Sequence, residues 1–254
     1  MAIKPDKTAE YRKRAQELVA QMTLKEKVSQ MLSWAPAIPR LGIPAYNWWS
    51  EGIHGMGRAG TATVFPQAVG MAAAFDPDMM RTVGDAVATE ARGKYNLCRS
   101  YGDRDIFKGL TVWAPNINIF RDPRWGRGHE TYGEDPYLTG RLGVGFVEGM
   151  QGDDPDYLKV AACAKHFAVH SGPEDQRHYF NAVVSKQDLW ETYLPAFKAL
   201  VEEAGVEAVM GAYNRTNGEP CCGSKTLLRD ILRGKWHFDG HVTSDCWAIK
   251  DFHE

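Results

Sequence analysis

Residues 160–169 read VAACAKHFAV, an apolar run in which a lysine and a histidine stand near the end. A short apolar run of this kind, bounded by polar segments, predicts a buried β-strand. Further runs of the same kind alternate along the chain with amphipathic helical stretches, and this alternation predicts βαβ units and a parallel sheet. The expected strands are 111–119, 160–169, 208–213 and 241–244, and the expected helices are 23–31, 77–95, 135–151, 185–204 and 227–233.

Polar residues beside these runs favour a closed barrel over an open sheet. They lie at or just past the ends of three expected strands and are Lys165, His166, Tyr213, Asn214 and Asp245. Barrel enzymes carry their chemistry at that end of the strands. No glycine-rich dinucleotide fingerprint follows any strand, and 254 residues suit a barrel that typically takes about 250. We therefore expect an α/β fold, a (β/α)8 TIM-type barrel.

The composition narrows the classes of partner. A formal net charge of −2 argues against nucleic-acid binding and fits an uncharged substrate. No apolar run is long enough to cross a bilayer, and the first residues lack a signal-peptide core, so we expect a cytoplasmic protein or one exported with its signal removed. The five cysteines are too scattered for a disulfide scaffold and show no zinc spacing. Among eight tryptophans, we interpret Trp48, Trp49 and Trp247 as platforms for sugar rings and the others as core residues.

Two strand ends carry candidate chemistry. Asp245 follows HVTS, and a carboxylate there is costly to bury unless it is paired or hydrogen-bonded. Spacing alone leaves two interpretations equally open, the N-cap of a helix starting near Trp247 or a catalytic group. Lys165 and His166 pose a similar choice between a solvated turn and a ligand-binding pair, because strand neighbours reach one ligand only where the strand ends.

Three polar segments are further candidates. RDPRWGRGHETYGED at 121–135 holds three arginines among four acids, which can pair with one another or leave one arginine for ligand hydroxyls. NWWSEGIHG at 47–55 is either a strand that packs its tryptophans into the core or a sugar pocket. PEDQRH at 173–178 contains no apolar residue, and a solvated loop is the alternative to a binding segment there.

Together, and in this order along essentially the whole chain, these segments resemble glycoside hydrolase family 3. SDCW at 244–247 resembles the family's nucleophile signature, which implies that Asp245 forms a covalent glycosyl-enzyme. KHF at 165–167 resembles its Lys-His pair, which implies that Lys165 and His166 hold sugar hydroxyls.

Other motifs extend the resemblance. WGRGHETYGEDP, which ends at residue 136, resembles the segment whose arginine binds the sugar, here Arg127. RH and GAYN match a further arginine, Arg177, and the tyrosine near the nucleophile, Tyr213. Trp247, beside the nucleophile, is expected to bind substrate as well.

Two positions resemble the family's β-xylosidase branch. Many family 3 β-glucosidases carry Asp-Gly where this chain reads Glu51-Gly52, and Cys246 stands where they often carry Trp. The longer Glu51 side chain can fill the room that a glucose hydroxymethyl group needs. The resemblance therefore implies a retaining enzyme that releases terminal β-linked xylose from xylo-oligosaccharides.

The implied mechanism needs two carboxyl groups about 5–5.5 Å apart and neither a metal nor an organic cofactor. Asp245 attacks, while Lys165, Arg177 and His166 are expected to orient hydroxyls and to keep it anionic. The resemblance places the general acid/base outside these residues, on a second α/β sandwich domain.

Residues 1–254 are therefore expected to form the family's N-terminal catalytic barrel, incomplete before its last strand-helix unit. The open edge would favour a homo-oligomer or a partner domain, and the chain alone would be a poor catalyst. A β-glucosidase, a non-catalytic sugar-binding barrel, and an aldolase using Lys165 as a Schiff base stay open as alternatives.

Overall fold

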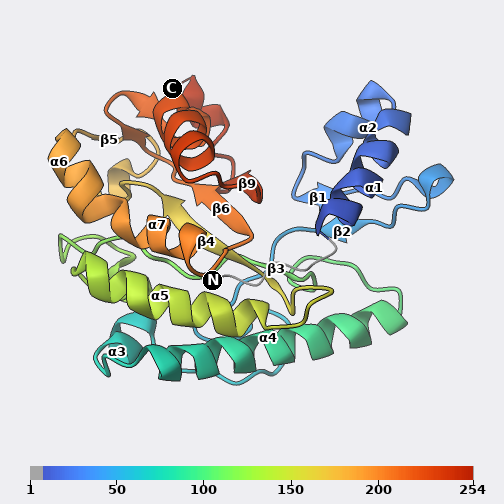
Figure 1. Cartoon of the computed structure of the whole chain (residues 1–254), viewed down its shortest axis with the longest axis horizontal. Coiled ribbons are helices and arrows are strands. Elements are labelled where there is room, and N and C mark those ends of the chain that lie inside the picture. The colour runs from blue at the N-terminus through green and yellow to red at the C-terminus, as the bar shows by residue number, and fades with distance from the viewer. Residues whose placement is uncertain (1–7, 254) are drawn as a thin grey trace.

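The computed structural model describes residues 8–253, and a four-stranded parallel sheet with strand order β3-β4-β6-β9 lies at its centre (Figure 1). The four strands are β3 (Thr111–Val112), β4 (Ala161–Phe167), β6 (Ala208–Gly211) and β9 (His241–Ser244). Consecutive strands of this sheet are joined by crossovers that contain helix, as parallel pairing requires. The prediction of an α/β fold with a parallel sheet is confirmed.

The segment after β2 (Tyr46–Asn47) extends the sheet beyond β3. Ser50 bridges Val112 in parallel, and its carbonyl oxygen accepts a 2.8 Å hydrogen bond from the Trp113 backbone N–H. The sheet curls so far that the Trp48 ring lies 5.3 Å from the His241 ring at the start of β9. Because the sheet curls in this way, the carboxyl ends of its strands face a common space, as in the barrel type that the sequence predicts.

The long helices α4 (Pro77–Ser100) and α5 (Pro136–Gln151), together with α7 (Pro195–Glu202), lie against one face of the sheet (Figure 1). Both long helices begin at a proline that follows an aspartate cap. The Asp76 side chain accepts hydrogen bonds from two backbone N–H groups of α4, and the Asp135 side chain accepts one from α5. Such caps satisfy amide groups that have no partner inside a helix, which explains why both helices start where they do.

Glycines allow α4 and α5 to pack backbone against backbone. A Cβ atom at Gly145 would collide with the Pro77 carbonyl, and one at Gly149 would collide with the Arg81 carbonyl. Substitution at either position would therefore push the helices apart.

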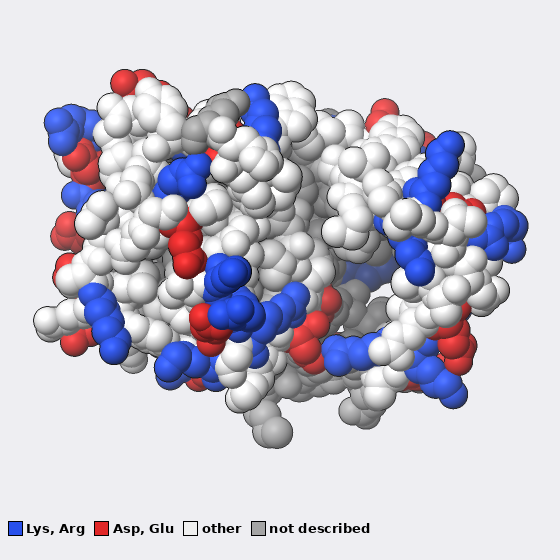
Figure 2. All heavy atoms as spheres, turned by 90° about the horizontal axis from the view of Figure 1, so that it is seen from above, with Lys and Arg blue, Asp and Glu red and all other residues white. Residues whose placement is uncertain are grey.

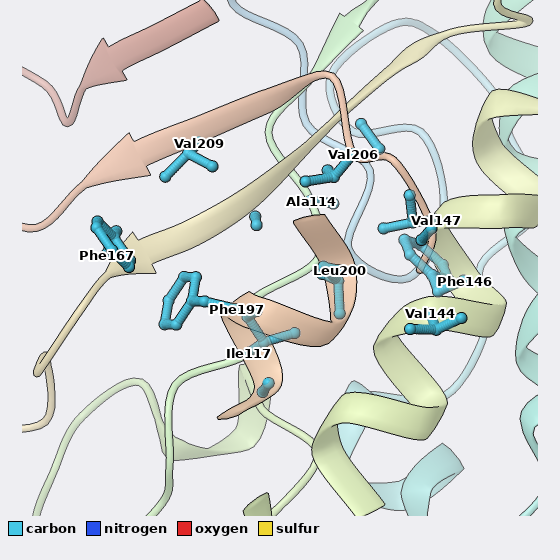
Figure 3. Packing of buried hydrophobic residues seen from close by; sticks show 14 of the residues in the cluster. Ala114, Ile117, Val144, Phe146, Val147, Phe167, Phe197, Leu200, Val206 and Val209 are labelled. Atoms are coloured by element: carbon cyan, nitrogen blue, oxygen red, sulfur yellow. The ribbon is translucent and has the colours of Figure 1, made fainter. Parts of the chain in front are cut away.

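The main core lies between these helices and the sheet. In Figure 3, Phe146 and Val147 of α5, Leu200 and Phe197 of α7, and Phe167 of β4 point into the same interior. These side chains are fully buried or nearly so. Burial of an aliphatic or aromatic side chain of this size contributes about 1.5–3 kcal/mol, which makes this layer the main support of the sheet.

Shorter elements complete the described part of the chain. Strands β1 and β2 form an antiparallel pair, and β5, β7 and β8 form a small separate sheet. The remaining elements are α1 (Thr8–Gln21), α2 (Leu24–Ser29), β1 (Trp34–Ala35), η1 (Pro39–Leu41), α3 (Ala68–Ala72), η2 (Gly128–Glu130), η3 (Glu174–Gln176), β5 (Asn181–Ala182), α6 (Lys186–Asp188), η4 (Leu189–Tyr193), β7 (Arg215–Thr216), β8 (Glu219–Pro220), η5 (Cys221–Gly223), η6 (Lys225–Lys235) and η7 (Lys250–Phe252).

The expected helices and strands are present, and two of them differ most from the predicted bounds. The strand expected at 111–119 is regular only over β3, because Pro115 has no N–H to donate to a ladder. The helix expected at 185–204 divides into α6, η4 and α7, and Pro195 starts the last of these. The helix expected at 23–31 is α2, with the capping box between Thr23 and Glu26 that the sequence predicts.

On the face seen in Figure 2, lysines and arginines are interspersed with aspartates and glutamates. This mixed surface agrees with a net charge near zero and produces no broad field of one sign on that face. Within residues 8–253, no helix has the length and apolar character needed to span a bilayer.

Candidate active site

The carboxyl ends of the parallel strands bring the predicted residues to one edge of the sheet. Lys165 and His166 lie near the end of β4, Tyr213 lies two residues past β6, and Asp245 directly follows β9. Glu51 directly follows Ser50, which bridges β3. Segments more than a hundred residues apart in sequence therefore meet at one end of the curled sheet.

An irregularity in β4 directs both of its basic residues into the site. The register of β4 against β6 shifts between residues 164 and 167. Such irregularities re-aim side chains that would alternate between faces in a regular strand. As a result, Lys165 Nζ lies 3.5 Å from Glu51 Oε2, and His166 Nε2 lies 3.4 Å from Asp245 Oδ2.

Asp245 is a buried carboxylate whose two oxygens differ. Its Oδ1 accepts a 2.8 Å hydrogen bond from the Cys246 backbone N–H. Its Oδ2 lies 4.0 Å from Arg127 Nη1 and is buried, yet it has no hydrogen-bond partner among the described residues. An acceptor left in this state beside a cation is available to a ligand or a reacting atom.

The interpretation of Asp245 as a helix N-cap is wrong. Residues 246–249 form turns, and the next helical segment, η7, has Ile249 at its N-cap position. Asp245 therefore caps no helix, and the alternative interpretation as a functional carboxylate is the one that the geometry favours.

His166 is held as a neutral acceptor. Asn118 Oδ1 lies 3.0 Å from His166 Nδ1 and 2.8 Å from the His166 backbone nitrogen. The Asn118 amide nitrogen donates to two backbone carbonyls, so its oxygen must face the ring, and Nδ1 carries the proton. Burial first, and then the charge of Arg127, hold the pKa of His166 well below its usual value. This environment favours a neutral ring that presents Nε2 to Asp245.

Arg127 is fixed by Glu130, a residue that the sequence analysis did not assign to the site. Arg127 Nε and Nη2 each donate a 2.8 Å hydrogen bond to the Glu130 carboxylate, and Asn116 supports that carboxylate at 3.5 Å. Burial opposes the Arg127 charge, but the bonds to Glu130 and the field of Asp245 outweigh it and raise its pKa. The i, i+3 spacing of Arg127 and Glu130 is the sequence signal that could have identified this pair.

Lys165 and Glu51 form the opposite wall. The Lys165 side chain is 4% exposed, so its charge is balanced inside the protein rather than by water. Glu51 accepts a 2.8 Å hydrogen bond from Trp49 Nε1, and the Trp49 ring stacks on Trp113 at 5.3 Å. This stack fixes the carboxylate that faces Lys165.

A cavity of about 350 Å³ opens between these two ion pairs. Its wall includes five of the residues just described, and it also includes residues that the sequence did not single out as candidates. The lining residues are Trp49, Glu51, Gly52, Ile53, His54, Gly55, Gly57, Arg58, Gln67, Phe107, Arg127, His129, Glu130 and Lys165. Most of the additional members come from the loop between β2 and α3, where no local pattern indicates which side chains face inward.

Arg177 and Tyr213 lie on the other side of Asp245. The Arg177 guanidinium stacks over the Tyr213 ring at 5.2 Å and is also 3.1 Å from Glu174. Burial first, and then the charge of Asp245, raise the pKa of Tyr213, so its phenol stays protonated beside the carboxylate. Tyr213 therefore presents a hydroxyl donor close to Asp245.

Trp247 does not join the cavity. It is 82% exposed and, like Asp245 itself, it is not among the residues that line the cavity. Trp48, a second expected sugar platform, packs against His241 at the opposite end of β9. Of the three reserved tryptophans, only Trp49 lines the cavity.

No metal centre is indicated among residues 8–253, because no group of three or more His, Cys, Asp or Glu residues is arranged to hold an ion. All five cysteines are free, and Cys163 and Cys221 are buried, as their interpretation as small apolar side chains predicts.

Comparison with known proteins identifies the group to which this arrangement is similar. Residues 13–254 match the family model described as the glycosyl hydrolase family 3 N-terminal domain. A xylan 1,4-beta-xylosidase of Xylanibacter ruminicola is 54% identical over 96% of this chain, and a beta-xylosidase/alpha-L-arabinofuranosidase 2 of Medicago sativa is 44% identical over 93%. The chain spans 29% and 32% of the lengths of these two relatives, so it matches about a third of each.

Solved structures agree with this likeness. A GH3 exo-beta-xylosidase, XlnD, in complex with a xylobiose aziridine probe superposes with a TM-score of 0.86 at 36% identity, over 94% of this chain and 32% of that one. A GH3 beta-glucosidase of Bifidobacterium adolescentis gives a TM-score of 0.78 at 34% identity, over 91% of this chain and 32% of that one.

Proposed function

This chain belongs to glycosyl hydrolase family 3, and from that premise we propose that residues 1–254 form the catalytic barrel of a retaining β-glycosidase that releases terminal β-linked xylose. We assign Asp245 as the nucleophile. One observation carries the assignment, namely that Asp245 Oδ2 is buried, lies 4.0 Å from Arg127 and has no hydrogen-bond partner among the described residues.

In the first step Asp245 Oδ2 attacks the anomeric carbon, and the leaving oxygen departs with the bonding electrons. The positive charge of Arg127 lies 4.0 Å from the oxygen that attacks. The neutral Nε2 of His166 faces the same space and can accept a hydrogen bond from a sugar hydroxyl. In the second step water cleaves the glycosyl ester and restores Asp245.

The cavity supports recognition of an uncharged, hydroxyl-rich ring. Its two ion pairs, Lys165 with Glu51 and Arg127 with Glu130, offer charged donors and acceptors that are already fixed. A hydroxyl can donate to the carboxylate and accept from the cation of one pair. Contacts of this kind strengthen in an oxocarbenium-like transition state and contribute several kcal/mol to catalysis.

The described site carboxylates are poor candidates for the general acid. Glu51 is held by Trp49 and Lys165, and the bonds to Arg127 outweigh burial and lower the pKa of Glu130. A general acid must carry its proton near the working pH. We therefore propose that the acid/base comes from a second domain, as the family resemblance implies, and that this part of the chain supplies the nucleophile and the sugar contacts.

Glu51 is the basis for a xylose-sized pocket. Its position is fixed by Trp49, so it cannot easily move aside for a hydroxymethyl group. The curated relatives named above as β-xylosidases support the same preference. A β-glucosidase is the second candidate, and the likeness to the Bifidobacterium adolescentis enzyme favours it.

The test is covalent labelling with an activated aryl 2-deoxy-2-fluoro-β-xyloside. Its leaving group needs little protonation, so the reaction proceeds without the acid. We expect a peptide containing Asp245 to gain the mass of one fluoroxylosyl group. Asp245→Asn should abolish labelling, and Asp85→Asn, an exposed aspartate on α4, should leave it unchanged. Labelling of a different carboxylate, or of none, would contradict the assignment.

Sugar preference is measured separately. The second-order labelling rates of fluoroxyloside and fluoroglucoside with the same leaving group are compared, and the xyloside should react faster. An equal or faster glucoside would favour the β-glucosidase.

A further inference from the structure

A second Asp-His contact lies beside the nucleophile, between two segments that follow different strands. His178 ends the charged loop after β4, and Asp251 lies in η7 after β9. His178 Nδ1 is 2.9 Å from Asp251 Oδ2. The Asp251 side chain is 1% exposed, whereas that of His178 is 41% exposed. A buried carboxylate thus holds one edge of an imidazole that lies partly in solvent.

Asp251 is anchored through its backbone. An Arg215 guanidinium nitrogen lies 3.2 Å from the Asp251 carbonyl oxygen and 3.4 Å from that of Phe252. The Phe252 ring packs so closely on η5 that a Cβ at Gly223 would lie 2.9 Å from it. Because η7 is fixed on two sides, the position of the Asp251 carboxylate is set before His178 meets it.

The imidazole in turn contacts the Tyr213 ring. The centroids of His178 and Tyr213 are 4.5 Å apart with the planes inclined at 59°, and Arg177 covers Tyr213 at 5.2 Å. Tyr213 follows β6 and Asp245 follows β9, and these strands pair Gly211 with Ser244, so the two residues leave the sheet side by side. After burial, the charge of Asp245 is the largest influence that raises the pKa of Tyr213. A chain of contacts therefore runs from Asp251 through His178 and Tyr213 to the carboxylate of Asp245.

Packing alone does not explain why the contacts from Asp251 to Asp245 are made by polar residues. A carboxylate removed from water costs several kcal/mol, and apolar residues of similar volume would often be no less stable. Asp251 Oδ1 is buried and has no hydrogen-bond partner among the described residues, so the pairing with His178 is incomplete as a stabilising device. A carboxylate does, however, fix the orientation of an imidazole, as in enzyme triads.

We infer that Asp251 and His178 are positioning residues that hold the Tyr213 phenol against Asp245. This inference rests on the proposed function. The Tyr213 phenol then stays beside Asp245 and keeps the carboxylate aligned with the anomeric carbon. A displacement of about 1 Å at a catalytic group can reduce the rate by about 100-fold. Loss of Asp251 or His178 should therefore have a measurable effect on the reaction at Asp245.

A double-mutant cycle tests the inference. The readout is the second-order rate of labelling by the aryl fluoroxyloside, for the chain with His178→Ala, Asp251→Ala, Asp251→Asn and Tyr213→Phe, alone and combined. His178→Ala and Asp251→Ala should each slow labelling by about 10- to 100-fold. Asp251→Asn should recover most of the rate, because its amide oxygen can still accept from Nδ1. In the Tyr213→Phe background, each alanine variant should change the rate by less than about 2-fold, since groups that act through one another are not additive.

The matched control is His253→Ala, which removes an exposed histidine from the same turn and should leave labelling unchanged. Alanine effects that persist in full in the Tyr213→Phe background would overturn the inference while Asp245 stays labelled. Failure of the unmodified chain to label would instead contradict the proposed function.

A second measurement does not depend on activity. A ¹⁹F resonance from 3-fluorotyrosine placed at position 213 should shift in His178→Ala and Asp251→Ala, and it should not shift in His253→Ala. An unchanged resonance in both positioning variants would show that the pair does not place Tyr213.

Discussion

His170 packs against His166, the histidine that faces Asp245, and its burial should make this protein lose stability in mild acid. It is 3% exposed, lies 4.8 Å from the His166 ring and 5.5 Å from the Trp125 ring, and has Asn214 Oδ1 3.2 Å from its Nδ1. Burial first, and then the charge of Arg127, lower its pKa from 6.5 to about 3. His170 therefore stays neutral in the folded state at neutral and mildly acidic pH.

The sign and size of the effect follow from proton linkage. Below pH 6.5 the unfolded chain binds a proton at His170 and the folded protein does not until the pH approaches about 3. The free energy of unfolding is therefore unaffected by His170 above pH 6.5. It falls as the pH drops from 6.5 towards 3, because only the unfolded chain binds the proton. Each pH unit in this window removes about 1.4 kcal/mol, so the step from pH 7 to pH 5 should remove about 2 kcal/mol.

The assay is urea unfolding at pH 7, 6 and 5, for the wild-type chain and for His170→Gln. Glutamine can keep a hydrogen bond to Asn214 and does not titrate. Between pH 7 and pH 5 the wild-type protein should lose about 2 kcal/mol of unfolding free energy that His170→Gln does not lose. The pKa values of Glu26 and Asp122 are lowered to about 2, so these groups stay ionised over this range in both proteins. An unchanged stability difference between pH 7 and pH 5 would show that His170 titrates normally in the folded state, and the argument from burial would fail.

Three further outcomes follow from the same structure. Asp245→Asn should reduce turnover of an aryl xyloside by about 10⁴-fold or more without lowering the melting temperature, because it removes the attacking group. Arg127→Lys should lower kcat/KM by about 10- to 100-fold, because lysine cannot reproduce the two hydrogen bonds to Glu130; a kinetic profile equal to wild type would refute a role for the planar guanidinium. Phe146→Ala should cost about 3–5 kcal/mol in urea unfolding, since the side chain is completely buried between α5 and the sheet, and a loss below 1 kcal/mol would place it outside the core.

Local signals in the sequence predict the main elements because they record local physics. An aspartate before a proline marks the start of α4 and of α5, since each caps free amide groups of its own helix. Apolar runs mark the strands, since a strand buried on both faces must be apolar throughout. Strand ends in turn predict that Lys165, His166 and Asp245 lie at one edge, because parallel strands share their direction. This information lies within about ten residues of each element.

Only the tertiary structure decides which side chains hold one another. Asn118 fixes the tautomer of His166 across 48 positions of sequence, and Asp251 meets His178 across 73. The sequence places Trp247 beside Asp245, but only the structure shows that the turn after β9 leaves its side chain exposed. Such pairings depend on how far the sheet curls and on how each connecting loop packs. Many segments contribute to these quantities at once, so no single stretch of sequence specifies them.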